Sequence, residues 1–335
     1  MGNFYFIGVD VSKKKLDFCL LGGEKVLHEE TVPNHWKSVS ELFKRLEEEY
    51  GIDSGRTVVC AEHTGQYTYP LSQGCTASGY KLWLEQAAQI KYSSGIQRGK
   101  DDRVDARRIA AYARRFHDRA CWHKQPEKEI ERLKQLEAER ALYVSDLAKY
   151  KGQLADQKDY MPKDLYARKA KRLAALMKDL EETIAAVNEE MDAVIRSNET
   201  LSRQMELLES VEGVGKVVAL NMIVCTEAFT RFDDPRKFNC FAGLAPFSYT
   251  SGSSLHSRAR VSHRADKTMK RLLHLAAVSV IRKKEGELKA YYERKVAEGK
   301  NKMATINAIR AKIVARMFAV IRKNQFYLPI LTQNV

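Results

Sequence analysis

Residues 127–196 constrain the fold more than any other stretch, because they contain a single glycine, Gly152, and a single proline, Pro162. In the second half of this segment, apolar residues recur mostly at spacings of three or four, at Leu173, Met177, Leu180, Ile184, Val187, Met191 and Val194. This periodicity predicts long amphipathic helices with a break near Met161 and Pro162. The two helices form either a helical hairpin or an intermolecular coiled coil, and a helix pair folded as its own domain fits the same pattern.

The helical segment divides the chain into three predicted domains, at residues 1–124, 125–200 and 201–335. A length of 335 residues is about twice that of a typical domain, so more than one folding unit is expected. The composition, 44% hydrophobic and 30% charged, is that of a globular rather than a disordered protein. We expect the middle domain to act as a spacer and to mediate oligomerisation.

The N-terminal segment predicts an α/β sheet. Residues 4–9 form an almost wholly apolar run that is typical of a central strand, and two further strands follow it at hairpin-like distances. The expected order is strands at 4–9, 16–21 and 26–32, a helix at 35–50, a strand at 57–62, a helix at 67–78 and a strand at 80–86. Strands that alternate with helices indicate a sheet that helices cover.

Four carboxylates in this segment are candidates for a metal site. Asp10 and Glu62 each end a predicted strand, and Asp102 and Asp105 lie one turn apart on a predicted helix. An oxygen-rich set of this kind suits Mg²⁺ or Mn²⁺. The alternative for each strand acid is a helix cap or a solvated loop, and for the helix pair it is charge complementarity with the helix N-terminus.

The charge of the chain predicts a polyanionic partner. Its net charge is +14, and residues 258–323 alone carry 19 Lys and Arg against 5 Asp and Glu. A helix is expected at 268–283, with Leu272, Leu273, Leu275 and Val278 on its buried side, and two more basic helices reach Lys323. We therefore expect nucleic acid to bind the C-terminal part first.

Residues 207–224 place Gly213 and Gly215 between two apolar helical segments, with Lys216 directly after them. Two glycines around one valine predict a tight turn whose amides approach a phosphate, as in helix-hairpin-helix DNA-binding elements. An ordinary turn between helices fits the same pattern.

Residues 241–264 combine a serine-rich loop with positive charge. Ser251, Ser253 and Ser254 surround Gly252, and basic residues follow at His256, Arg258, Arg260, His263 and Arg264. A serine hydroxyl beside fixed positive charge is suited to meet a phosphodiester, and Arg258, Arg260 and Arg264 are candidates for contacts to the phosphate. The alternative is a solvated connector.

The cysteines and the hydropathy indicate the compartment. The six cysteines show no C-x-x-C spacing and lie mostly among apolar residues, which predicts buried thiols and neither a zinc site nor a disulfide frame. No apolar run approaches the roughly 18 residues that span a bilayer, and the N-terminus lacks a signal-peptide pattern. We expect a cytoplasmic protein with no membrane partner.

Five motifs, in this order and spacing, resemble the DEDD-type insertion-sequence transposases of the IS110 family, the bridge-RNA-guided recombinases. They are IGVDVSKKKLD, E-x-T-G-x-Y from Glu62, K-x-D-x-x-D-A from Lys100, VEGVG, and FAGLAPFSYTSGSS. The resemblance covers nearly the full length. Two positions depart from the family pattern: Glu212 replaces a proline in the turn, and His63 follows Glu62 where a small residue or proline is usual.

The resemblance implies an N-terminal RuvC-like, RNase H-type mixed sheet with helices, a coiled-coil middle and a helical C-terminal transposase domain with the hairpin-like turn. Position by position, the catalytic and metal-binding acids fall on Asp10, Glu62, Asp102 and Asp105, and the serine nucleophile falls on Ser251. Asp101 adjoins Asp102, but only Asp102 keeps the three-residue spacing to Asp105.

The resemblance also implies the partners. Family members use Mg²⁺ or Mn²⁺ and a non-coding bridge RNA that pairs with target and donor DNA. Their dimers assemble into tetramers, in which composite sites combine the acids of one subunit with the serine of another. Such a protein acts on the nucleoid of a prokaryotic cell.

Our leading hypothesis is RNA-guided DNA recombination, in which the acids hold Mg²⁺ and Ser251 attacks a phosphodiester to give a phosphoserine link. One rival is a metal-dependent nuclease or junction resolvase that uses water, with Ser251 as a loop residue. The other is a non-enzymatic nucleic-acid-binding scaffold. The sequence specifies neither the guide RNA nor the target and donor sites.

Overall fold

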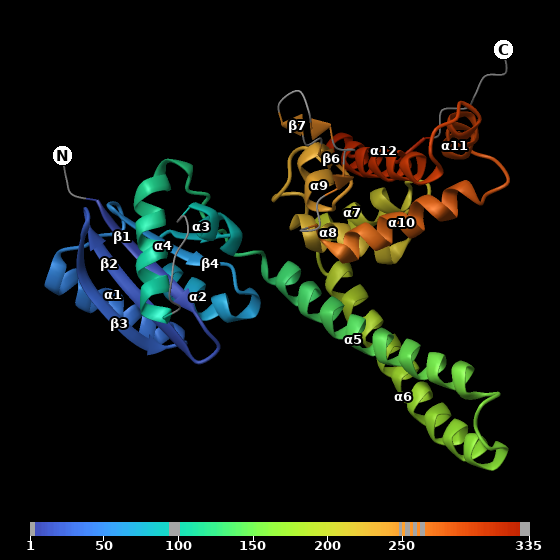
Figure 1. Cartoon of the computed structure of the whole chain (residues 1–335), viewed down its shortest axis with the longest axis horizontal. Helices are drawn as coiled ribbons and strands as arrows, with labels where there is room; N and C mark the ends of the chain where they lie inside the picture. Colours follow the sequence, from blue (N-terminus) through green and yellow to red (C-terminus); the bar gives the residue numbers. More distant parts are fainter. Residues whose placement is uncertain are drawn as a thin grey trace. The chain divides into compact units, whose positions relative to one another are not determined.

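The computed structural model describes residues 4–93, 101–247, 250–251, 255–256, 260–261 and 265–328. For the described residues between 250 and 260, it describes the backbone only. Two compact units make up the chain, Met1–Gln125 and Pro126–Val335 (Figure 1). The sequence predicted three domains, with the middle segment 125–200 on its own. In the structure, this middle segment shares a unit with the C-terminal helices.

The N-terminal unit contains a five-stranded mixed sheet with the strand order β3-β2-β1-β4-β5. Its strands are β1 (Tyr5–Val11), β2 (Lys15–Gly22), β3 (Lys25–Pro33), β4 (Thr57–Glu62) and β5 (Leu82–Glu85). The first three form an antiparallel meander, whereas β4 runs parallel to β1, and β5 runs parallel to β4. The predicted mixed sheet with helices is therefore confirmed for this unit.

Helices cover both faces of the sheet, because the strand side chains alternate between two apolar clusters (Figure 1). On one face, Ile7 and Val9 pack with α1 (Trp36–Tyr50) and α2 (Tyr69–Ala77), which follows a short 3₁₀ turn at Gly65–Thr68. On the other face, Phe6 and Cys60 pack with α4 (Asp102–Phe116), and the short α3 (Ala87–Ser93) contributes Ile90.

Gly8 determines how closely α4 approaches the sheet. A Cβ atom at this position would lie 2.2 Å from the Ala106 carbonyl oxygen and 2.2 Å from the Ala110 amide nitrogen. Only glycine leaves room for helix backbone at that distance. The contact places the first turn of α4 on the face of β1 that carries Asp10.

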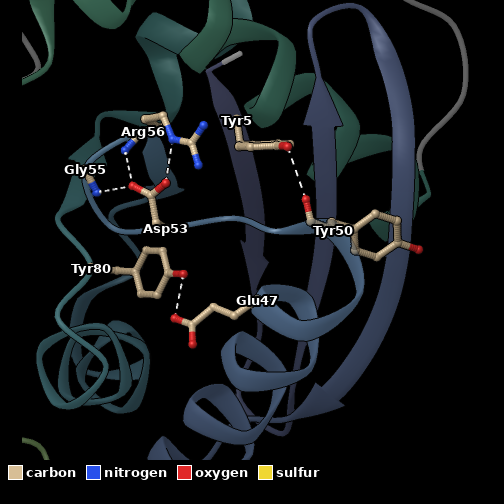
Figure 2. A network of polar contacts seen from close by, with 7 residues as sticks. All are labelled: Tyr5, Glu47, Tyr50, Asp53, Gly55, Arg56 and Tyr80. Carbon is tan, nitrogen blue, oxygen red and sulfur yellow. Dashed lines mark hydrogen bonds and ion pairs between the residues drawn. The ribbon is translucent and has the colours of Figure 1, made fainter. Parts of the chain in front are cut away.

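Polar contacts fix the connection between α1 and β4 on the edge of the unit (Figure 2). Asp53 accepts hydrogen bonds from the backbone amides of Gly55 and Arg56 at 2.9 and 3.0 Å, and it pairs with the Arg56 guanidinium. The Tyr5 hydroxyl donates to the Tyr50 carbonyl oxygen at 3.1 Å. The Asp53 bonds hold the turn before β4, and the Tyr5 bond ties the end of α1 to the start of β1.

The second unit begins with two long helices, α5 (Lys128–Gln157) and α6 (Lys163–Arg196), that form an antiparallel hairpin (Figure 1). The predicted break near Pro162 lies between them. Cross-helix ion pairs join Lys151 to Glu181 at 2.8 Å and Arg132 to Glu190 at 2.6 Å. At the base of the hairpin, Leu133 and Met191 belong to the same apolar cluster as the C-terminal helices, so the two segments share one core.

The described remainder of this unit is mostly helical, as predicted, and α10 and α12 both contribute to its core. Its helices are α7 (Glu199–Glu209), α8 (Lys216–Thr226), α9 (Pro235–Phe241), α10 (Lys267–Ile281), α11 (Glu287–Ala297) and α12 (Lys302–Lys323). One expectation about α10 is wrong: Leu275 is 55% exposed. The buried stripe instead runs through Ala276, Ala277 and Val280, because these positions continue the face of Leu272 and Leu273.

Two short ladders lie where the sequence predicted a loop. β6 (Pro246–Phe247) pairs with β9 (Arg260–Val261), and β7 (Thr250–Ser251) pairs with β8 (Leu255–His256). Two-residue strands carry too little hydrophobic alternation to be recognised in a sequence.

Among the described residues, no helix is long and apolar enough to span a membrane. All six cysteines are free. Cys19, Cys60 and Cys75 are buried as expected, but Cys121 and Cys240 are exposed, so the prediction of buried thiols is only partly right.

Candidate metal centre

Three acids on neighbouring strands face the same side of the sheet. Asp10 follows Gly8 by two residues in β1, and Glu62 follows Cys60 by two residues in β4, so both share the face that α4 covers. The antiparallel register of β1 and β2 places Asp17 directly opposite Asp10. Strand pairing alone therefore gathers three carboxylates beneath the start of α4.

Helix α4 adds two carboxylates from its first turn, Asp102 and Asp105. The neighbouring Asp101 is the N-cap residue, and its Oδ1 accepts a hydrogen bond from the Arg103 amide at 3.2 Å. Because the cap holds the Asp101 side chain, the geometry favours Asp102 over Asp101 as the residue that faces the sheet.

The carboxylate oxygens of Asp10, Asp17 and Asp102 lie within 4.8 Å of one another. Glu62 and Asp105 belong to the same group electrostatically, since both raise the pKa of Asp10. We call Asp10, Asp17, Glu62, Asp102 and Asp105 the acid centre. The structure thus brings together the four acids that the sequence singled out and adds Asp17.

Among the described residues, the acid centre has more carboxylates than basic groups in ion pairs with it. Burial, followed by repulsion from Asp102, Asp105, Glu62 and Asp17, raises the pKa of Asp10 to about 6. Burial and the nearby Asp105 also raise the pKa of Glu62. A bound cation would relieve this repulsion, so the arrangement fits a hard divalent metal, and its all-oxygen donors fit Mg²⁺ or Mn²⁺.

Two basic side chains contact the acid centre. Lys15 Nζ lies 3.0 Å from Asp17 Oδ2 and 2.8 Å from Asp102 Oδ2. Arg108 Nη1 lies 2.6 Å from Asp105 Oδ1, one helical turn away. In the described part of the chain, two basic groups are thus in ion pairs with a centre of five carboxylates.

Asp17 is the residue that reasoning from the sequence missed. It lies between the buried Leu16 and Phe18, in a strand that is otherwise apolar, and it is only 2% exposed. The sequence does offer one sign of Asp17, which is an acid among apolar strand residues. To place it opposite Asp10, one must also know the length of the β1–β2 turn, in which the Ser12 hydroxyl donates to the Lys15 carbonyl oxygen at 2.9 Å.

The turn between α7 and α8 carries Gly213, Gly215 and Lys216, and the structure gives Gly213 a packing role. Gly213 has a φ of +85°, and a Cβ atom there would lie 2.4 Å from Val280 Cγ2. Gly215 caps α8 with open space around it, and no side chain caps the first amides of the helix. Lys216 pairs with Asp192.

A pocket of about 650 Å³ lies beside this turn. Its lining includes Gly213, Gly215 and Lys283, together with Glu209, Glu212 and Glu287. Glu212 pairs with Lys283 and Glu287 pairs with Arg316, so these basic groups are already engaged by acids, and phosphate binding at this turn remains a prediction.

Ser251 is the last residue of β7, and its backbone pairs with Leu255 of β8. The segment 252–254, with Ser253 and Ser254, lies outside the described residues, as do Arg258 and Arg264. The backbone of Arg260 lies in β9, opposite Phe247. Contacts of the serine and of these three arginines with DNA remain predictions.

Two family models match the chain. One, described as "Transposase IS116/IS110/IS902 family", matches residues 205–293 and includes the α7–α8 turn and Ser251. The other, a DEDD model of IS110 described as "Transposase", matches residues 7–159 and includes all four acids predicted from the sequence.

Curated relatives extend over nearly the whole chain. The chain is 22% identical over 326 residues to the pilin gene-inverting protein of Moraxella bovis, which covers 96% of each chain, and equally to that of Moraxella lacunata. It is 26% identical over 158 residues to an uncharacterized 43.6 kDa protein of insertion element IS110 from Streptomyces coelicolor, over 46% of this chain and 38% of that one.

Among solved structures, the chain is similar to T. thermophilus RuvC in complex with a Holliday junction substrate. The two are 12% identical, with a TM-score of 0.28, over 36% of this chain and 99% of the other.

Proposed function

The chain belongs to the IS116/IS110/IS902 family of transposases, and from this premise we propose that it catalyses RNA-guided DNA recombination of an insertion sequence. The observation that carries the proposal is the acid centre, in which carboxylates from β1, β2, β4 and α4 meet on one face of the sheet. Oxygen ligands grouped in this way are suited to chemistry at a phosphodiester.

In the proposed mechanism, Asp10, Glu62, Asp102 and Asp105 hold Mg²⁺ or Mn²⁺. The ion, when bound, supplies positive charge that stabilises the negative charge developing on the phosphoryl oxygens. The carboxylates alone would repel a phosphate, so their role in this proposal is to hold the ion in a fixed position. Gly8 contributes indirectly, since it allows α4 to bring Asp102 and Asp105 against β1.

Ser251 is the proposed nucleophile. Its Oγ attacks the phosphorus, the bond from phosphorus to a deoxyribose oxygen breaks, and the DNA remains joined to the protein as a phosphoserine diester. The hydroxyl proton leaves with a base, and the departing DNA oxygen takes up a proton. In the second step a DNA hydroxyl attacks the phosphoserine and releases Ser251. Each step exchanges one phosphodiester for another, so no external energy source is needed.

The charge of the second unit supports nucleic-acid partners. Residues 258–323 combine 19 Lys and Arg with 5 Asp and Glu. We propose that this surface and its neighbours bind a non-coding bridge RNA together with target and donor DNA, with Arg258, Arg260 and Arg264 close to the serine segment.

The hairpin of α5 and α6 supports assembly into dimers and tetramers. Its exposed apolar side chains include Leu142 at 59%, Leu165 at 45% and Leu176 at 49% exposure. Apolar side chains on an exposed helix pair are suited to pack against another copy of the chain.

A covalent adduct tests the proposal against its rivals. Full-length protein is incubated with Mg²⁺, RNA transcribed from the flanks of its own element, and DNA that carries the element ends. A protein–DNA adduct that survives denaturant is expected from the wild type. Ser251→Ala should abolish the adduct and the recombinant product, while Ser254→Ala, a matched change in the same segment, should keep both.

The outcomes separate the three hypotheses. DNA cleavage that survives Ser251→Ala but is lost in Asp10→Asn would indicate a water-dependent nuclease or junction resolvase. Salt-sensitive binding without any cleavage, unchanged by either substitution, would indicate a scaffold. Recombination without RNA would refute guidance and leave the serine step intact.

A further inference from the structure

Lys15 lies at the acid centre, and although its side chain is partly exposed, its ammonium contacts two of the carboxylates. Its ammonium bridges Asp17 Oδ2 and Asp102 Oδ2 at 3.0 and 2.8 Å. These are two of the three residues whose oxygens lie within 4.8 Å of one another. Lys15 thus takes oxygens that a metal ion in this position would need.

Only one of the two carboxylate oxygens of Asp17 accepts a hydrogen bond from a described residue. Its side chain is buried, and the Thr31 hydroxyl donates to Oδ1 at 2.5 Å. Within the described residues, the buried Oδ2 accepts no hydrogen bond of good geometry, and Lys15 meets it only as an ion pair. Buried carboxylates are normally fully hydrogen-bonded, paired or bound to metal, so Oδ2 is available as a ligand.

Building on the proposed metal-dependent function, we propose that Asp17 is a fifth carboxylate ligand of the centre and that Lys15 is a resident cation which the metal ion displaces. Mg²⁺ and Mn²⁺ bind carboxylate oxygens at about 2.1 Å. An ammonium that remained on the same oxygens would lie within a few ångströms of a dication, and the two would repel. Lysine and metal therefore compete for Asp17 and Asp102.

Lys15 is built to leave without disturbing the fold. Its side chain is 43% exposed, so the flexible stem can swing the ammonium into solvent. Its backbone stays in the sheet, opposite Pro33. In the absence of metal, the same side chain holds Asp102 of α4 beside Asp17 of β2 and so keeps the centre assembled.

Metal titration of six full-length proteins tests the inference. Mn²⁺ binding is measured by electron paramagnetic resonance of free Mn²⁺ and by calorimetry for the wild type, Lys15→Met, Asp17→Asn, the double variant of these two, Lys14→Met and Asp10→Asn. Lys14→Met is the matched control, because it removes the same charge from an exposed neighbour one residue away. Asp17→Asn keeps the shape of the side chain and an oxygen acceptor for Thr31.

Competition makes two predictions. Lys15→Met should bind Mn²⁺ about tenfold more tightly than the wild type, while Lys14→Met stays within about twofold. In the Lys15→Met background, where Lys15 no longer competes, Asp17→Asn should weaken binding about tenfold or more. If Lys15→Met leaves the affinity unchanged, Lys15 is no competitor, and if Asp17→Asn costs nothing in that background, Asp17 is no ligand.

Failure of this inference is distinguishable from failure of the proposed function. Asp10→Asn removes an acid that the proposed function itself requires. If the wild type and Asp10→Asn bind Mn²⁺ equally weakly, the metal-dependent function fails. If only Asp10→Asn loses Mn²⁺ and the Lys15 and Asp17 variants match the wild type, the function stands and the roles of Lys15 and Asp17 are refuted.

Discussion

The acid centre and the α7–α8 turn both gather carboxylates, but they balance the charge differently. At the turn, Glu212 lies 3.4 Å from Lys283 and 3.9 Å from Arg316, and Arg316 lies 2.7 Å from Glu287. Two acids there face two basic groups. At the acid centre, five carboxylates are paired in the described residues with Lys15 and Arg108.

The difference separates a structural ion network from a site built for a ligand. A balanced network links the turn to the segment before α11 and to α12, and it accounts for Glu212, which replaces the proline usual in the family. Burial, and then repulsion within the unbalanced cluster, raises the pKa of Asp10 and of Glu62. Such a cluster costs stability in the absence of a cation, which is a common property of functional sites.

The largest expected effect is on catalysis. Asp10→Asn removes one charge at the middle of the acid centre and should lower recombination by roughly a thousandfold, since a metal ion contributes several kcal/mol to a displacement. The measurement is the yield of recombinant DNA against time at saturating Mg²⁺. Glu48→Gln, an exposed acid on α1, is the control and should retain full activity. Comparable loss in both variants would contradict a specific role for Asp10.

Next in size is the effect of the close approach of α4 to β1. Gly8→Ala would place Cβ 2.2 Å from helix backbone, so α4 must shift, at a cost of about 3 kcal/mol in the free energy of unfolding. All three tryptophans, Trp36, Trp83 and Trp122, lie in the N-terminal unit, so tryptophan fluorescence in a denaturant titration reports on this unit.

The shift of α4 should also weaken Mn²⁺ binding in Gly8→Ala. Gly152→Ala in α5 is the contrasting change, because nothing lies within 4 Å of its added Cβ. It should stabilise the second unit by about 0.5–1 kcal/mol, as alanine does inside a helix. Gly8→Ala with wild-type stability would show that α4 does not depend on this contact.

The ion network at the turn should show a smaller effect, confined to the other unit. Glu212→Gln leaves the Arg316 guanidinium, which is 14% exposed, with one acid fewer, and should destabilise the second unit by about 2 kcal/mol. Far-UV circular dichroism reports on the helices of both units, so the loss should appear there as an earlier transition, while the tryptophan transition of the N-terminal unit should not move.

A compensating variant distinguishes a charge effect from a packing effect. Glu212→Gln combined with Arg316→Met removes both charges and should recover part of the loss. If the double variant is as unstable as the sum of the single variants, the network is not what Glu212 provides.

The same contrast shows what the sequence could predict. The five strands and the helices α1, α2 and α4 were predicted from the sequence. Strand ends and helix spacing made Asp10, Glu62, Asp102 and Asp105 candidates, and the family resemblance assigned them their proposed role. The roles of Asp17 and Lys15 were not predicted, because their contacts depend on the β1–β2 register and on how closely α4 packs against Gly8. Leu275 was misplaced because apolar identity alone does not specify a helix face.

The smallest expected effect is on stability, and it depends on pH. The pKa of Asp10 is raised from 3.8 to about 6 in the folded protein, so between these values the folded state keeps a proton that the unfolded state has released. As the pH rises through this window in EDTA, the wild type should therefore lose stability relative to Asp10→Asn. The full shift corresponds to about 3 kcal/mol, but Asp10 is only partly buried and solvent screens it, so we expect about 1 kcal/mol.

Denaturant titrations followed by tryptophan fluorescence at pH 4.5, 5.5, 6.5 and 7.5 measure the difference, and saturating Mg²⁺ at pH 7.5 should reverse its sign. If the difference does not change with pH, or if Mg²⁺ does not alter it, the acid centre is not a site of unbalanced charge. It would then be a structural ion network like the one at Glu212.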